Sequence, residues 1–383
     1  MVRILWLCTH RTQWREEVPL LLEAGFEVIP AKLGHPEYPV NEQPDDPYYV
    51  QSWRERCTLP ADQVDRLREV NWFQDAPPDL VGLANEAFDA VIVTSFFDTL
   101  TRVGRWFTKP ILFRLFGLAG IGCYTEVFGQ AGLKELPQSE AYRNNRYYWC
   151  PILATLRHAE HSILTRNEVV LEPFVSPERL SARWQAENRK PYVALVLSRV
   201  AQTSYYGNIY SRITSHFRSG QPAIPLRILG QNQQGALGDE EIVGTLPDEE
   251  YFEMLARATA MFYQGDSICH LHWSVLEALA MGVPVVMLHQ GYLAWLLREI
   301  VGLRAQGPGY GIVEGLDEAR SLLQQCLDDR EAAANIAYRQ QPLAAYITDR
   351  DRGARQIQKR LGAILGLATS DSAQDTFQFR QSA

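Results

Sequence analysis

The sequence predicts an α/β protein with two halves, each built around a parallel sheet with helices on both faces. Short, wholly apolar segments alternate with helical patterns along most of the chain. Such segments are typical of parallel strands that are buried on both faces. Residues 176–191 are polar and carry prolines near both ends, which is the composition of a linker. With 383 residues, the chain has room for about two to three domains.

The first half opens with a strand–helix–strand unit. Residues 2–8 form an apolar run, residues 14–22 carry apolar side chains at helical spacing, and residues 26–29 form a second apolar run. Proline is favourable in the first turn of a helix, so we expect the regular helix to begin near Pro19. The other elements expected here are a helix at 62–70, strands at 90–93, 110–113 and 162–165, and an irregular proline-rich excursion at 34–49.

The second half repeats this alternation. A helix is expected to begin near Pro247, because the three acidic residues that follow it favour a helix N-terminus. We expect strands at 192–197, 226–230, 241–245, 260–263 and 283–288, and helices near 274–282 and after 317. The expected division is a first domain at 1–178, a second at 190–340, a helix at 341–367 packing back toward the first, and a disordered tail at 368–383.

Charge and composition exclude several classes of protein. Lysine and arginine number 37 against 45 aspartates and glutamates, a net charge of −8, which argues against general nucleic-acid binding. The six cysteines form no Cys-x-x-Cys pair, so we expect reduced thiols and no zinc site. The longest apolar run, 278–288, is shorter than the roughly 20 residues of a membrane span. We therefore expect a cytoplasmic protein, and a peripheral contact with the inner membrane face is compatible with this.

The segment 265–286 carries the clearest chemical signal. A loop leads to a helix near Ser274, which ends at Gly282 before the next strand. Ser274 and Glu277 have the spacing of a capping box, so Glu277 is a candidate helix cap. A helix N-terminus at the end of a strand also suits a diphosphate, and Glu277 could accept hydrogen bonds from a ribose diol. Both interpretations of Glu277 stay open.

This segment resembles the donor site of the GT-B glycosyltransferases, and in particular the retaining, glycogen-synthase-like (group 1) families. Their pattern is Glu-x7-Glu-Ala followed by Gly-x-Pro-Val-Val, and Glu277, Gly282 and Pro284 match it. The first glutamate of the pattern is replaced by Cys269, which removes the usual contact to the donor sugar. The resemblance implies two Rossmann-like domains that face a central cleft, with the nucleotide-sugar held by the second.

Further matches extend the resemblance over about residues 192–330. The family's strand that ends in a glycine loop corresponds to Gly230 and Gln231, and its phosphate-binding arginine corresponds to Arg199, although the lysine that usually follows is missing. Gly207 is a candidate for a second helix N-terminus. The donor-binding residues implied in this way are Arg199, Gly207, Gly230, Gln231, His270, His272, Ser274, Val275, Leu276 and Glu277.

The first half matches the family less well. Thr94 or Ser95 stands where the family has a histidine, and no glycine-rich loop follows the first strand. Candidate general bases in loops of this half are His10, Asp98 and Glu126. The candidate acceptor-side residues are Arg114, Arg143, Tyr148 and Trp149, and core packing is the alternative for the aromatic ones.

The function implied is transfer of a sugar from a nucleotide-sugar to a hydroxyl acceptor, which could be a glycan, a lipid-linked sugar or a small molecule. Retention is slightly favoured, and inversion with an N-terminal base is the alternative. A sugar-nucleotide epimerase and a non-catalytic binding protein of the same fold are the other candidates. We expect no metal and no cofactor beyond the donor, and a role in polysaccharide biosynthesis.

Overall fold

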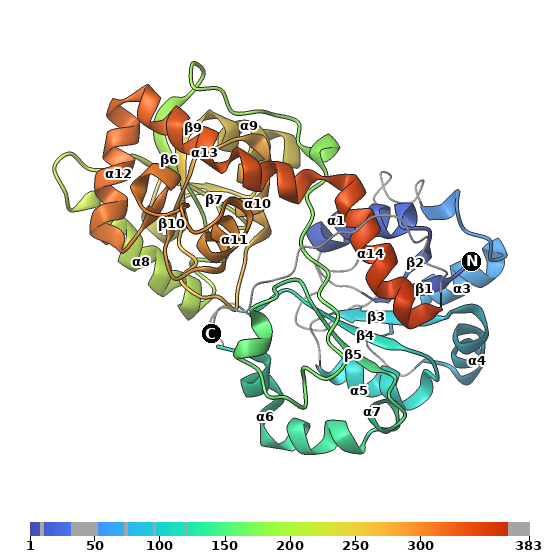
Figure 1. Cartoon of the computed structure of the whole chain (residues 1–383). Helices are drawn as coiled ribbons and strands as arrows, with labels where there is room; N and C mark the ends of the chain where they lie inside the picture. The colour runs from blue at the N-terminus through green and yellow to red at the C-terminus, as the bar shows by residue number, and fades with distance from the viewer. Residues whose placement is uncertain (8–10, 32–52, 73–75, 95–96, 119–121, 367–383) are drawn as a thin grey trace.

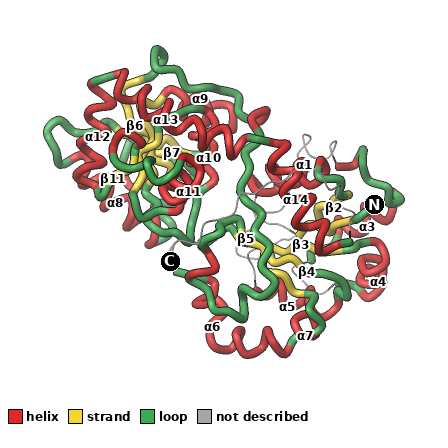
Figure 2. Tube along the Cα trace, in the orientation of Figure 1, coloured by secondary structure: helices red, strands yellow, loops and turns green. Residues whose placement is uncertain are grey.

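The computed structural model describes residues 1–7, 11–31, 53–72, 76–94, 97–118 and 122–366. Two α/β domains lie side by side, and each has its strands in the centre and its helices outside (Figures 1 and 2). The expected excursion at 34–49 and the expected tail at 368–383 lie outside the described residues. Within the described part of the chain, no helix is both long and apolar enough to cross a membrane.

The first domain contains a five-stranded parallel sheet in the order β2-β1-β3-β4-β5. Its strands carry mostly buried side chains, so the prediction of a doubly covered sheet is confirmed. The order reverses between β1 and β3, and these two strands therefore form the switch point of the domain. The strands are β1 Arg3–Leu7, β2 Glu27–Ala31, β3 Ala90–Thr94, β4 Ile111–Leu115 and β5 Tyr147–Pro151.

Two predictions in the first domain were wrong. The fifth strand is β5, whereas residues 162–165 form turns, of which Leu164 is the only fully buried residue. The helix α1, Arg11–Glu23, begins eight residues before Pro19 and contains it. Its apolar side chains are buried on both sides of the proline, and this packing offsets the hydrogen bond that the proline removes. The other helices are α3 Ala61–Glu69, α4 Pro78–Ala87, α5 Phe97–Trp106, α6 Tyr124–Glu135 and α7 Glu140–Arg143.

The second domain contains a six-stranded parallel sheet in the order β11-β10-β9-β6-β7-β8. This is a Rossmann-type order, in which the first and fourth strands of the domain, β6 and β9, are neighbours. The strands expected in this half are all present. They are β6 Lys190–Val196, β7 Leu226–Leu229, β8 Ile242–Gly244, β9 Ala258–Tyr263 and β10 Val285–Leu288, and the structure adds a short strand that was not predicted, β11 Ile312–Val313.

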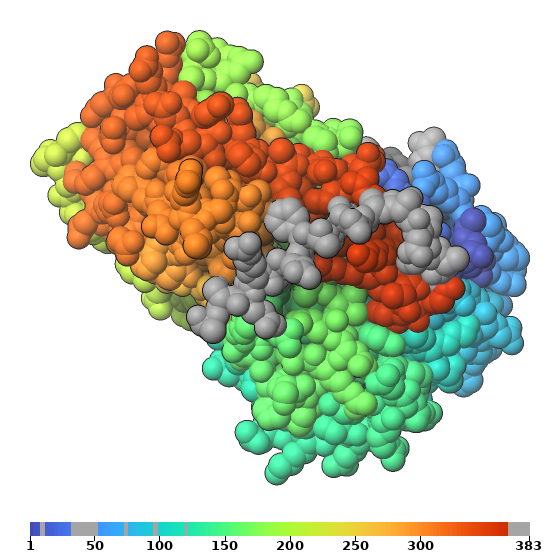
Figure 3. All heavy atoms as spheres, viewed as in Figure 1, coloured from blue at the N-terminus to red at the C-terminus, as the bar shows by residue number. Residues whose placement is uncertain are grey.

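The helices that the sequence predicted near Pro247, near 274–282 and after 317 are all present in the second domain. The α-helices of this half of the chain are α8 Ser204–Arg218, α9 Asp248–Arg257, α10 Trp273–Met281, α11 Tyr292–Val301, α12 Leu316–Asp328, α13 Arg330–Thr348 and α14 Arg350–Leu365. The helix α13 packs on α10, α11 and α12, and α14 then leaves this domain to pack against α1. The C-terminal helices thus run over the surfaces of both domains (Figure 3).

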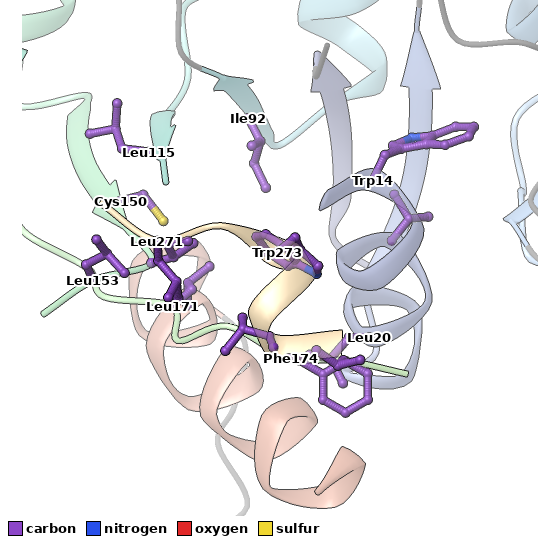
Figure 4. Close-up of a cluster of buried hydrophobic side chains, with 14 of the residues drawn as sticks. Trp14, Leu20, Ile92, Leu115, Cys150, Leu153, Leu171, Phe174, Leu271 and Trp273 are labelled. Carbon is purple, nitrogen blue, oxygen red and sulfur yellow. The ribbon is translucent and has the colours of Figure 1, made fainter. Parts of the chain in front are cut away.

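A continuous apolar cluster joins the two domains. Leu271 and Trp273, from the start of α10 and the loop before it, lie among first-domain side chains such as Trp14 and Leu115 (Figure 4). Phe174, just before the linker, belongs to the same cluster, and Gly353 of α14 allows that helix to lie close against Leu20 and Phe174. Burial of these large side chains fixes the first turn of α10 against α1. The domains therefore meet where the strands of both sheets have their carboxyl ends.

Candidate functional site

The loops that follow β6 and β7 are tied together at the switch point of the second domain. The Asn232 side chain is buried, and its Nδ2 donates to the Leu197 carbonyl at 2.7 Å while its Oδ1 accepts from the Val200 amide at 3.1 Å. Sequence reasoning missed Asn232, although an asparagine two residues after a strand-ending glycine is a common turn signal. These bonds define the path of the backbone that leads to the predicted phosphate contact.

Gly230 is required where the two loops cross. Its φ is +123°, and a Cβ there would lie 2.7 Å from the Leu197 carbonyl oxygen and 2.8 Å from Ser198 Oγ. The next residue, Gln231, donates its amide hydrogen to Ser198 Oγ at 3.0 Å. Gly230 and Gln231 therefore lie directly beside the end of β6, at the edge where ligands of doubly wound sheets bind.

Arg199 occupies the turn between β6 and α8. Its φ is +57°, and its amide donates to the Gln231 carbonyl at 2.9 Å. Its own carbonyl accepts from the amide of Thr203, and the Thr203 hydroxyl caps α8. The prediction that Gly207 opens this helix was wrong, because α8 begins at Ser204 and Gly207 lies inside its first turn. Arg199 and the N-terminus of α8 are nevertheless brought to one place.

Two of the predicted residues, His270 and His272, contact each other. Their Nε2 atoms are 3.2 Å apart, and the hydroxyl of Tyr206, in the first turn of α8, lies 3.3 Å from His272 Nε2. The His272 amide donates to the Tyr263 hydroxyl at 3.2 Å. Burial lowers the pKa of His270 well below its ordinary value, so this imidazole is neutral near pH 7. Sequence reasoning missed Tyr206, because its contact depends on how α8 and the β9 loop meet.

The segment around Cys269 is held by the first domain. Gly117, just after β4, pairs with His270 as an isolated antiparallel bridge, and the Thr155 hydroxyl donates to the Ile268 carbonyl at 2.6 Å. Cys269 itself is buried, and burial raises the pKa of its thiol. The residue that replaces the family's first glutamate is thus a neutral thiol in a segment anchored across the domain interface.

Glu277 does not cap its helix. The helix α10 begins at Trp273 with His272 as its N-cap residue, and no side chain caps it, so the predicted capping box was wrong. Ser274 is the second residue of the helix, two positions past the N-cap residue His272. Glu277 is buried and instead pairs with Arg179 of the linker. The side chains of Val275 and Leu276 are fully buried, so only their backbone groups can take part at the helix N-terminus.

Of the three candidate bases, the structure describes only the side chain of Glu126. His10 and Ser95 lie outside the described residues, as does the side chain of Asp98. Glu126 is exposed on α6, where its carboxylate accepts a hydrogen bond from the Gly122 amide at 3.1 Å. Thr94 is buried, and its hydroxyl lies 3.4 Å from the Leu7 carbonyl. The general base of the first domain therefore stays a prediction.

The predicted acceptor surface at Arg114 and Trp149 was wrong. Trp149 is fully buried and packs edge-on against Tyr124. Arg114 is also buried, with its guanidinium bonded to Glu17 at 2.7 Å and to main-chain carbonyls. Both belong to strands covered on both faces, so burial follows from their position in the sheet. Arg143 is exposed and Tyr148 half-buried, but Arg143 precedes β5 and so lies at the amino ends of the strands.

A cavity of about 470 Å³ lies at the carboxyl ends of β10 and β11. It is lined by polar side chains that include His289 and Arg298. Arg298 donates to the His289 carbonyl at 2.6 Å, which holds the cavity wall in place. Across the residues that the structure places, no group of three or more histidine, cysteine or acidic side chains is arranged to hold a metal ion.

No family profile matches this sequence, and no curated protein sequence matches it. The fold does match solved structures along nearly the whole chain. Sucrose-phosphate synthase from Thermosynechococcus elongatus aligns with a TM-score of 0.61 and 12% identity, over 96% of this chain and 100% of that chain. HepE from Anabaena, in complex with UDP and glucose, aligns with a TM-score of 0.61 and 14% identity, over 95% and 100%.

A glycosyltransferase from Rickettsia africae aligns with a TM-score of 0.57 and 12% identity, over 96% of this chain and 99% of that chain. These structures share the GT-B fold, and the expectation of two Rossmann-like domains in this arrangement is confirmed. The retaining subtype is not decided by the fold.

Proposed function

We propose that this protein is a glycosyltransferase that moves a sugar from a nucleotide-sugar donor, bound by the second domain, to a hydroxyl acceptor. The observation that carries the proposal is the convergence of Arg199, the Gly230 loop and the N-terminus of α10 at the switch point between β6 and β9. Dinucleotides and nucleotide-sugars bind doubly wound sheets at this place. The fold is also that of HepE, whose structure was solved with UDP-glucose.

The chemistry of this arrangement suits a leaving diphosphate. The amides of the first turn of α10 and the guanidinium of Arg199 would stabilise the negative charge that develops as the glycosidic bond breaks. Glu277 would accept hydrogen bonds from the ribose hydroxyls of the nucleotide. The contacting pair His270–His272 would lie at the sugar side of this helix N-terminus, where Cys269 offers no carboxylate. These contacts need no metal, and treatment with EDTA should leave activity unchanged.

Binding of a nucleoside diphosphate tests the proposal. UDP, GDP, ADP and dTDP, together with CMP, should be compared by isothermal titration calorimetry and by the shift in melting temperature. One nucleotide should bind at micromolar concentration and raise the melting temperature, whereas inorganic phosphate alone should not. The donor-site proposal is wrong if none of these nucleotides binds.

A non-catalytic binding protein is the second candidate, and the replacement of the family's first glutamate by Cys269 favours it. Release of the nucleotide from its sugar donor, with and without candidate acceptors, separates the two. Turnover that depends on an acceptor supports the transferase, and conversion of the donor alone supports an epimerase. The anomeric configuration of the product, read by NMR, decides between retention, which we slightly favour, and inversion.

The remaining details of the proposal concern the acceptor and the place of action. We propose a glycan, a lipid-linked sugar or a small molecule as acceptor, in polysaccharide biosynthesis. Work in the cytoplasm, with a peripheral contact to the inner membrane face, would accommodate a lipid-linked acceptor. Sedimentation of the protein with anionic vesicles, compared with neutral vesicles, tests this membrane contact.

A further inference from the structure

Three consecutive charged residues of α1, at positions 15–17, form ion pairs with three different parts of the molecule. The first pairs with Asp248 at the start of α9, the second with Arg179 of the linker, and the third with Arg114 of β4. The first two partners lie outside the first domain. One turn of α1 therefore connects the first-domain sheet, the linker and the second domain by charge.

Arg179 joins two carboxylates that belong to different domains. Its Nε donates to Glu16 Oε1 at 2.7 Å, and its Nη2 donates to Glu277 Oε1. The second oxygen of Glu16 accepts from the Ser176 amide at 2.6 Å, which ties the linker to α1 as well. The guanidinium carbon also lies 5.2 Å from the ring centre of Phe252. Glu16, Arg179 and Glu277 thus form a linked network of ion pairs across the two domains.

The three side chains of this ion-pair network are largely buried. The side chains of Glu16, Arg179 and Glu277 are 0%, 10% and 8% exposed. A buried carboxylate without a partner costs several kcal/mol, and the ion pair with Arg179 offsets this cost for Glu277. A carboxylate has about four acceptor positions, and a donor from Arg179 leaves acceptor capacity for hydroxyl groups of a ligand.

We infer that Arg179, oriented by Glu16, is a positioning residue that holds the Glu277 carboxylate in place and aimed at the ribose hydroxyls of the donor. This inference rests on the proposed function, because it assigns a partner to a residue of that donor site. Arg179 contacts the Glu277 carboxylate, and its expected effect on the nucleotide is exerted through that carboxylate. Since Glu16 belongs to the first domain, the carboxylate is held in place only while α1 and α10 lie together.

The planar fork of an arginine is suited to this task. It can bond to two carboxylates at once with fixed geometry, whereas a lysine offers a single point charge. Replacement of Arg179 by Lys should therefore keep the protein folded but restore only part of the nucleotide affinity. Arg350 provides a matched control, because it pairs with Glu23 of α1 at 2.8 Å beside the same linker and does not contact Glu277.

The test compares UDP with 2′,3′-dideoxy-UDP, or the same pair for whichever base the nucleotide screen selects. In the wild type, loss of the two hydroxyls should weaken binding about tenfold. Arg179→Met should weaken UDP about tenfold and leave the dideoxy analogue unchanged. Arg179→Lys should fall between, and Arg350→Met should behave like the wild type. Glu277→Gln should match Arg179→Met, and the double variant should lose little more than either single variant.

Each other outcome counts against the inference. If Arg179→Met weakens both nucleotides equally, the arginine has only a structural role. If it weakens neither, or if the losses of the double variant add fully, Arg179 does not act through Glu277. If the wild type binds UDP and its dideoxy analogue equally, Glu277 does not read the ribose, although a nucleotide site exists. Absence of any nucleoside diphosphate binding to the wild type overturns the proposed function itself.

Discussion

Gly117 and His270 pair across the two domains, the first from the end of β4 and the second from the loop before α10. The contact is so close that a Cβ at Gly117 would lie 2.3 Å from the Cys269 carbonyl oxygen, and its φ is +89°. Both the backbone conformation and the lack of space for a Cβ exclude residues other than glycine at position 117. The loop that carries Cys269 and His270 and leads into α10 is therefore shaped by the first domain, although it follows β9 of the second domain.

The variant Gly117→Ala should destabilise the protein and loosen this loop. Left-handed backbone strain and the clash together should cost about 2 to 5 kcal/mol in the free energy of unfolding. Chemical denaturation and hydrogen exchange over residues 265–272 measure these effects. Gly25→Ala is the control, because its φ is also +89° but no atom lies within 4 Å of the added Cβ. Equal losses in the two variants would show that the interdomain contact is unimportant.

The variant Asn232→Ala should lower both stability and nucleotide affinity. It leaves the Leu197 carbonyl and the Val200 amide without their partner in a buried turn, at a cost of about 2 to 4 kcal/mol. Arg199 lies between these two backbone groups, so the variant should disturb the Arg199 turn and calorimetry should show weaker UDP binding. Asn188→Ala, at an exposed asparagine that bonds Gln185, should change neither quantity. An unchanged nucleotide affinity in Asn232→Ala would separate this turn from the donor site.

The variant Glu16→Gln should change how stability depends on pH. Burial raises the pKa of Glu16 to about 7, against the opposing effect of Arg179, while the Glu277 charge adds to the rise. A raised folded-state pKa means that the glutamate contributes stability below its unfolded pKa near 4.5 and loses it as pH rises through 7. Relative to Glu16→Gln, the wild type should lose about 3 kcal/mol between pH 4.5 and pH 8.

Urea denaturation of both proteins across this pH range measures the difference. The contributions of the other titrating groups to the pH dependence of stability cancel in this comparison, because these groups are common to the two proteins. A difference that does not change with pH would mean that Glu16 titrates near its ordinary value in the folded protein.

The variant Arg114→Met should destabilise the first domain without a selective effect on acceptor use. It leaves the carboxylate of Glu17 buried without a cation, which should cost about 3 to 5 kcal/mol. The double variant Arg114→Met with Glu17→Gln should recover part of this loss, because the uncompensated charge is gone. Thermal unfolding measures the stability, and kcat/KM for the acceptor should stay the same at temperatures where the variants are folded. A selective rise in the KM for the acceptor would contradict this and indicate that Arg114 does contribute to acceptor binding.

Most of the strands could be predicted from the sequence because buried parallel strands are continuous apolar runs. The same rule caused the error at 162–165, because a short apolar run can also belong to a turn that packs against a strand. Leu164 lies in such a turn, and its carbonyl accepts a hydrogen bond from the Tyr147 hydroxyl of β5. The true strand, β5, contains two tyrosines and a tryptophan, and these aromatic residues favoured a surface interpretation. Only the position of β5 beside β4 explains why Tyr147 and Trp149 are buried.

By itself, the sequence determined two α/β halves, the end of α10 at Gly282 and the presence of Glu277 on that helix. These features depend on local periodicity and on backbone preferences of single residues, which act over a few positions. Tertiary structure alone decided that Glu277 pairs with Arg179, 98 residues earlier, and that Tyr206 meets His272. A side chain's partner depends on which distant segments the packed sheets and helices bring within hydrogen-bond distance, and no local pattern encodes that distance.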